Sequence, residues 1–158
     1  MKRRIFIASV ALVALTACST VSVSEGSART GYSVADALAE QLPADKRPSG
    51  ALLIAPAFAL GREGISSGFG QAMSDALASR LVHLGFKVVD ARSKFPARRF
   101  GEPIAKSAME QASAMGAVAV VLGSYSNDGA NYSVNYRIVR VADSSVLAST
   151  DTVVRYGE

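Results

Sequence analysis

Residues 67–90, SGFGQAMSDALASRLVHLGFKVVD, predict a helix that is followed directly by a strand. Apolar side chains recur at three- and four-residue spacing as far as Leu84, which is typical of the buried face of an amphipathic helix. Gly85 lies where a helix takes a left-handed cap, and Phe86 can then pack back on the last turn. The strand Lys87 to Asp90 begins at once. This helix-to-strand step is part of the connection from which α/β folds are built.

Segments on either side extend this unit into a parallel sheet. Upstream, Ala51 to Phe58 is a short apolar run that suits a buried strand. Downstream, residues 102–115 begin with Glu-Pro and predict a second helix, which Gly116 caps in the same way. The continuously apolar run Ala117 to Leu122 then predicts a central strand that is covered on both faces.

The last third of the chain changes its hydrophobic period to two. Apolar and polar residues alternate from Tyr132 to Ile138, as in a strand with one buried face. Asn127-Asp128-Gly129 supplies a turn before this strand, and Asp143-Ser144-Ser145 supplies a turn before a last strand, Val146 to Val154. We therefore expect an α/β fold with a mixed sheet: one helix, then β-α-β-α-β and a C-terminal antiparallel hairpin, with the helices packed on a single sheet.

The chain of 158 residues has the size of one domain, and it divides into three segments. Residues 1–17 carry basic residues and then an apolar run too short to span a bilayer, which predicts a secretory signal peptide. Residues 18–31 are rich in Ser, Thr and Gly and predict a flexible tether. A helix is expected from Ser33, at the start of a folded domain over residues 32–158.

Cys18 is the predicted lipidation site. The stretch Leu15-Thr16-Ala17-Cys18 resembles the lipobox of bacterial lipoproteins, in which the cysteine is acylated and the preceding bond is cut. A signal peptide that contains a cysteine by chance is the alternative. Because Ser19 and not Asp follows, the resemblance implies an outer-membrane anchor and a domain facing the periplasm. A single cysteine also excludes a disulfide framework and a Cys-rich zinc site.

The charge balance argues against nucleic acid as a partner. The net charge is +4, but several of the basic residues lie in the leader, so the mature chain is close to neutral. One basic stretch remains, between the strand Lys87 to Asp90 and the helix predicted over residues 102–115. It could bind an acidic partner, or it could be a solvated loop. Its candidate binding residues are Arg92, Lys94, Arg98 and Arg99.

The sequence patterns that could indicate a catalytic or metal site do not support one. His83 is the only histidine and lies on a last helical turn, which favours a surface or cap position over a metal site. Gly68-Phe69-Gly70 begins like a dinucleotide fingerprint, but Met73 takes the third small position, so helix packing is the better interpretation. We expect no catalytic residue, metal, cofactor or small-molecule substrate. Three tyrosines are interpreted as core and cross-strand packing and not as a recognition patch: Tyr125, Tyr132 and Tyr136.

Three segments resemble the FlgO-type outer-membrane lipoproteins associated with flagella. They are ASRLVHLGFKVVD at 78–90, VLGSY at 121–125 and VNYRIV at 134–139, and the resemblance covers about Tyr32 to Thr152. It implies a non-enzymatic envelope component that supports flagellar assembly or stability through protein-protein contacts. The arrangement of strands, helices and hairpin also resembles that of the N-terminal domain of TolB, of the secretion lipoprotein CsgG and of LpoB-type activators of penicillin-binding proteins. A regulatory module for a cell-wall synthase and an envelope assembly or secretion component therefore stay open as alternatives.

Overall fold

The computed structural model describes residues 23–60, 68–89, 104–129 and 131–155. The predicted mixed α/β fold class is confirmed, with a first helix, a parallel part and an antiparallel C-terminal part. The elements are α1 (Val23–Glu40), β1 (Leu52–Ile54), β2 (Phe58–Ala59), α2 (Gly68–His83), β3 (Val88–Val89), α3 (Ile104–Ala114), β4 (Ala119–Asn127), β5 (Asn131–Arg140) and β6 (Val146–Arg155).

The strands form one sheet in the order β3-β1-β4-β5-β6, and β2 also pairs with β4. β1 runs parallel to both β3 and β4, whereas β5 is antiparallel to β4 and to β6. Both predicted hairpin turns are confirmed. Gly129, with a φ of 96°, lies in the first, and Ser144, with a φ of 58°, lies in the second. The parallel half is thus joined by helices and the antiparallel half by short turns.

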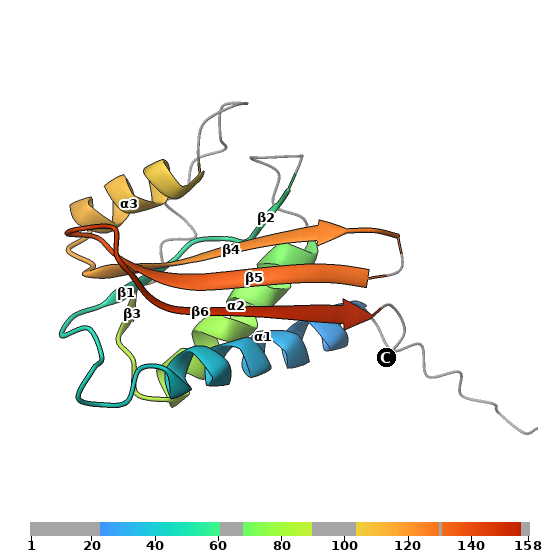
Figure 1. The fold of residues 1–158 in the computed structure, drawn as a ribbon, viewed down its shortest axis with the longest axis horizontal. Helices are drawn as coiled ribbons and strands as arrows, with labels where there is room; N and C mark the ends of the chain where they lie inside the picture. Colours follow the sequence, from blue (N-terminus) through green and yellow to red (C-terminus); the bar gives the residue numbers. More distant parts are fainter. Residues whose placement is uncertain (1–22, 61–67, 90–103, 130, 156–158) are drawn as a thin grey trace, which may run out of the picture.

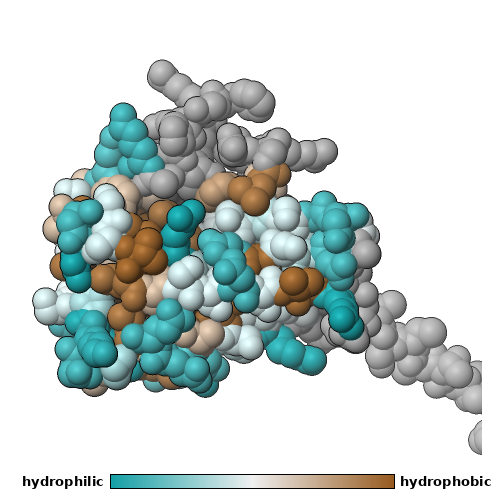
Figure 2. All heavy atoms as spheres, in the orientation of Figure 1, coloured by the Kyte–Doolittle hydropathy of each residue, from teal (hydrophilic) through white to brown (hydrophobic). Residues whose placement is uncertain are grey.

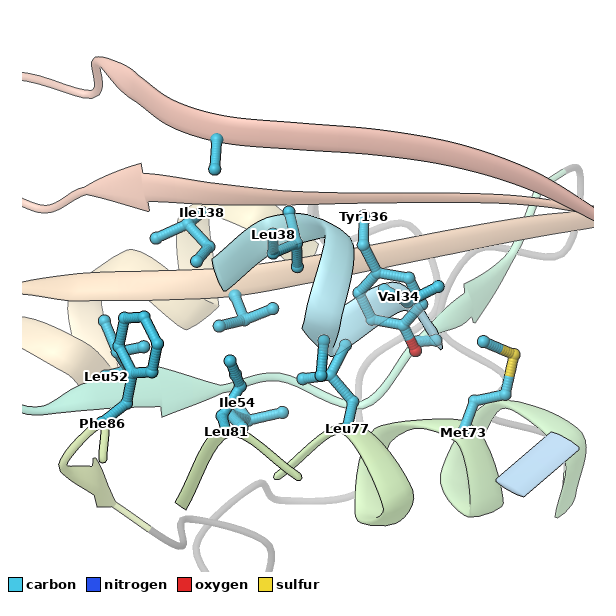
Figure 3. Packing of buried hydrophobic residues seen from close by; sticks show 14 of the residues in the cluster. Val34, Leu38, Leu52, Ile54, Met73, Leu77, Leu81, Phe86, Tyr136 and Ile138 are labelled. Carbon is cyan, nitrogen blue, oxygen red and sulfur yellow. The ribbon is translucent and has the colours of Figure 1, made fainter. Parts of the chain in front are cut away.

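Helices cover both faces of the sheet (Figure 1): α1 and α2 lie on one face and α3 lies on the other. Successive side chains of β4 point to opposite faces of the sheet. Val121 packs in the larger core under α1 and α2, and Val120 packs in the smaller core under α3. β4 is therefore covered on both faces, as its apolar run predicted. In Figure 3, Tyr136 and Ile138 of β5 point from the sheet toward the helices of the larger core.

Both predicted glycine caps are confirmed. Gly85 has a φ of 86° and Gly116 a φ of 68°, values that glycine adopts without strain. After Gly85, the N–H of Phe86 donates to the carbonyl of Leu81 at 3.0 Å, and after Gly116 the N–H of Ala117 donates to the carbonyl of Ala112 at 2.9 Å. Each cap turns the chain from a helix straight into the strand that follows.

The predicted start of the first helix is wrong, because α1 begins at Val23 and not near Ser33. The part of the predicted tether from Val23 onward belongs to this helix, while residues 1–22 lie outside the described residues. The added turns pack through small residues. Ser27 is buried, and a Cβ on Gly31 would lie 2.7 Å from the Cβ of Ala76 in α2. Close packing of this kind gives no apolar periodicity in the sequence.

The single strand predicted over Ala51 to Phe58 is two short strands, β1 and β2, with Pro56 between them. Proline has no backbone N–H and interrupts a sheet ladder. Beyond it, the N–H of Ala57 donates to Oγ of Ser74 at 3.0 Å, a side chain of α2. The chain then rejoins the sheet where Phe58 pairs with Ser124 of β4.

Candidate binding groove

The predicted lipidation site and the predicted binding residues lie outside the described residues, so they stay predictions: Cys18, Arg92, Lys94, Arg98 and Arg99. The basic residues that flank the predicted cluster are described. Lys87 is exposed between α2 and β3, and exposed Lys106 on α3 lies 3.9 Å from Oε1 of Glu110.

The packing interpretation of the tyrosines is confirmed. Tyr136 is fully buried and Tyr125 is 5% exposed. Tyr132 stacks on Phe69 of α2 with ring centroids 4.1 Å apart. His83 is exposed in the last turn of α2, as predicted for a surface histidine.

The buried hydroxyl of Tyr136 belongs to a structural hydrogen-bond network. Oγ of Ser74 donates to the carbonyl of Gly70 at 2.9 Å, so the Tyr136 hydroxyl, 3.3 Å away, donates to Oγ of Ser74. Burial, which disfavours the charged phenolate, raises the pKa of Tyr136 to about 12. The phenol is therefore neutral at physiological pH and ties β5 to α2.

Within the described ranges, no group of three or more His, Cys, Asp or Glu side chains is placed to hold a metal ion. A bilayer-spanning helix, long and apolar enough to cross a membrane, is also not found among the described residues.

A groove of about 500 Å³ lies at one end of the sheet, and we call it the end groove. The α1–β1 loop, the α3–β4 junction and the β5–β6 turn meet there, at the left in Figure 1. Its lining residues are Lys46, Arg47, Pro48, Ser49, Ala117, Val118, Arg140, Val141, Ala142 and Leu147.

The floor of the end groove is apolar and is held by backbone hydrogen bonds. The N–H of Val118 donates to the carbonyl of Ala51 at 2.9 Å, and the N–H of Val141 donates to the carbonyl of Val118 at 3.0 Å. Gly50 lies so close that an added Cβ would be 2.5 Å from Cγ1 of Val118. Together these contacts fix Val118 between β1 and the end of β5.

The charged side chains of the lining are all cationic. Arg47 is used structurally, since Nε donates to the carbonyl of Leu42 at 3.1 Å, Nη1 donates to that of Leu84 at 2.8 Å, and the guanidinium lies 4.3 Å from the ring centre of Phe86. Arg140 forms an exposed ion pair with Asp143 at 3.0 Å. The ammonium of Lys46 is exposed and contacts no partner among the described side chains.

The end groove was missed from the sequence because its cations are far apart along the chain. Lys46 precedes β1 and Arg140 ends β5, so neither lies in a local basic cluster. The pairing register of the β5–β6 hairpin brings Arg140 beside the α1–β1 loop. Hydrophobic patterning alone does not define that register.

Comparison with solved structures finds the same fold in three bacterial proteins. The LpoB C-terminal domain from Escherichia coli has a TM-score of 0.59 and 18% identity, covering 78% of this chain and 97% of that chain. The LpoB C-terminal domain from Salmonella enterica has a TM-score of 0.53 and 18% identity, covering 77% and 95%. The lipoprotein GNA1162 from Neisseria meningitidis has a TM-score of 0.52 and 19% identity, covering 69% and 82%. At these identities the likeness shows the fold alone.

The family comparison is more specific, and it confirms the resemblance found in the sequence. No curated protein matches the chain. The sequence model of the FlgO protein family matches residues 32–158, which include every strand of the sheet and the helices α2 and α3. The chain therefore belongs to the FlgO protein family.

Proposed function

We propose that the protein is a non-enzymatic lipoprotein of the bacterial outer membrane that supports the assembly or stability of the flagellum. The observation that carries this proposal is the FlgO family match over residues 32–158. The lipobox-like stretch that ends at Cys18 adds the anchor, and the folded domain then faces the periplasm.

The described domain has features that suit binding to another protein. The end groove is open, its floor is apolar and its charged side chains are cationic, which is a common composition of recognition surfaces. The buried phenol of Tyr136 is enclosed in a hydrogen-bond network with Ser74 and serves packing. A supporting role in the envelope requires no catalysis at the end groove or at Tyr136.

The anchor is tested by replacing the acylated thiol. Cys18→Ala is expected to abolish incorporation of labelled fatty acid and to remove the protein from the outer-membrane fraction, whereas Ser19→Ala leaves both unchanged. Ser19→Asp is expected to keep the acyl group and to move the protein to the inner membrane. A Cys18→Ala protein that is still acylated and still fractionates with the outer membrane would rule out the anchor.

The flagellar role is tested in a deletion strain. We expect reduced swimming in soft agar and fewer or unstable filaments, restored by the wild-type chain and not by Cys18→Ala. Normal swimming and normal filaments in the deletion strain would refute the flagellar role.

A second candidate is a regulatory module for a cell-wall synthase, favoured by the similarity to LpoB domains, of which this chain covers nearly the whole length. Affinity capture of the acylated protein from native membranes separates the two. Recovery of flagellar ring or hook-basal-body proteins supports the first proposal, and recovery of penicillin-binding proteins supports the second. Detergent-stable rings of the purified protein would instead favour a secretion component.

A further inference from the structure

We propose that the end groove binds an acidic segment of the partner protein, with a carboxylate at the cationic rim and an apolar side chain on the floor. This inference rests on the proposed function, because it names the chemistry of the protein-protein contact that the function requires. It does not depend on whether the partner is flagellar.

The floor of the end groove consists of apolar side chains that the fold does not bury completely. The lining residues Val118, Val141 and Leu147 are only partly buried, although Leu147 packs against the larger core and Val141 against the smaller one. In Figure 2, hydrophobic side chains reach the surface toward this end of the sheet and are surrounded by hydrophilic ones. An apolar centre with a polar rim is the usual arrangement of a protein-binding patch.

The rim selects negative charge. Lys46 comes from the α1–β1 loop and Arg140 from the end of β5, and no carboxylate is among the lining residues. Arg140 has one ion-pair partner, Asp143, whereas Lys46 contacts no described side chain. A carboxylate entering between Lys46 and Arg140 would meet two cations, and pairing with a charged group gives both specificity and faster association.

The groove is formed before any ligand enters. Arg47 ties its loop to the ends of α1 and α2, and the β5–β6 turn is closed by hydrogen bonds from Ser145 to Asp143 at 3.0 and 2.7 Å. A surface that is already ordered costs less conformational entropy on binding. Arg47 therefore shapes the groove, while Lys46 and Arg140 supply the charge.

A protein segment fits this recess better than a membrane surface does. The space of about 500 Å³ lies between three chain segments, and a side chain that projects from an extended peptide can enter it. A flat bilayer would contact the tips of the loops and would leave the apolar floor open.

The test places a photoreactive phenylalanine analogue at Ser49, an exposed lining residue, in the acylated full chain in living cells. The crosslinked peptide is identified by mass spectrometry. The same analogue at Ser79, exposed on α2, is the control position. We expect capture from Ser49 of one segment that carries a carboxylate beside an apolar side chain, and no capture of that segment from Ser79.

The charge is tested in the same cells. Lys46→Glu is expected to reduce the Ser49 crosslink by about tenfold or more, because it places like charges together. Changing the captured carboxylate to lysine should restore it. Lys87→Glu makes the same change of charge at an exposed lysine outside the groove and should have no effect.

Capture from Ser49 of a segment with no carboxylate would overturn the inference, and so would a crosslink that Lys46→Glu leaves unchanged. Capture of phospholipid alone would overturn it as well and would assign the rim to the membrane. The proposed function fails separately, through normal swimming of the deletion strain.

Discussion

The side-chain amide of Gln41 forms two hydrogen bonds with the backbone of Ser149. Nε2 donates to the carbonyl at 2.9 Å, and Oε1 accepts from the N–H at 3.1 Å. Ser149 lies in β6, the last strand in the sheet order, so the edge of β6 has no neighbouring strand in the described fold. Gln41 therefore pairs with this edge strand as the backbone of a further strand would.

Loss of this pairing should destabilise the domain and expose the edge. Gln41→Ala is expected to lower the free energy of unfolding by about 1 kcal/mol. It should also speed aggregation, because unpaired edge groups are templates for intermolecular pairing. Urea unfolding and light scattering measure the two effects. Gln71→Ala, at an exposed position of α2, is the control, and equal behaviour of the two variants would contradict the role of Gln41.

The elements that could be predicted from the sequence are those with a local physical signal. Gly85 and Gly116 mark helix ends because a left-handed cap favours glycine, and the structure has both caps. The first turns of α1 carry no such signal, since Ser27 and Gly31 pack by being small. The apolar run predicted one strand across Pro56, and which residues of β4 pair with β2 beyond this proline depends on the whole sheet.

The candidate site was less predictable than the fold. The sequence offered a local run of basic residues, from Arg92 to Arg99, either as candidate binding residues or as a solvated loop, and this run lies outside the described residues. The end groove instead combines Lys46, Val118 and Arg140, which are distant in sequence and meet through sheet register. A site of this kind can be found only after the topology is known.

Gly123 and Tyr136 should show strong energetic coupling. They pair across β4 and β5, and a Cβ on Gly123 would lie 2.3 Å from Cε1 of Tyr136. Gly123→Ala is therefore expected to cost about 1–3 kcal/mol of stability through overpacking. Tyr136→Leu alone is expected to lower the free energy of unfolding by about 3–5 kcal/mol, as other large-to-small core substitutions do. It also frees the space beside residue 123.

A double-mutant cycle measured by urea unfolding checks this coupling. The double variant should be less destabilised than the sum of the two single variants. Gly68→Ala is the matched control, because a Cβ added there would have no atom within 4 Å, and it should leave stability nearly unchanged. Additive effects of Gly123→Ala and Tyr136→Leu would mean that the ring does not set the requirement for glycine.

The adjacent residues Lys46 and Arg47 should separate binding from stability. Arg47→Ala removes hydrogen bonds to the carbonyls of Leu42 and Leu84 and the contact with Phe86, so a loss of about 2–3 kcal/mol is expected. Lys46→Ala should leave the urea midpoint unchanged, since its ammonium contacts no described side chain. A midpoint that falls equally in both variants would contradict this division of roles.

The β5–β6 turn should carry a pH-dependent part of the stability. Hydrogen bonds from the hydroxyl and N–H of Ser145, with Arg140 nearby, lower the pKa of Asp143 from 3.8 to about 2. A carboxylate with a depressed pKa in the folded state stabilises that state fully above the pKa of the unfolded chain. This contribution is lost as the pH falls from 3.8 to about 2.

Carboxyl NMR titration of the folded protein should therefore give Asp143 a midpoint near 2. In urea unfolding over the same acid range, Asp143→Asn should remove part of the loss of stability, because the amide does not titrate. Asp45→Asn, at an exposed position of the α1–β1 loop, controls for the removal of one negative charge. An Asp143 midpoint close to 3.8 would show that Ser145 and Arg140 do not hold the carboxylate in the folded protein.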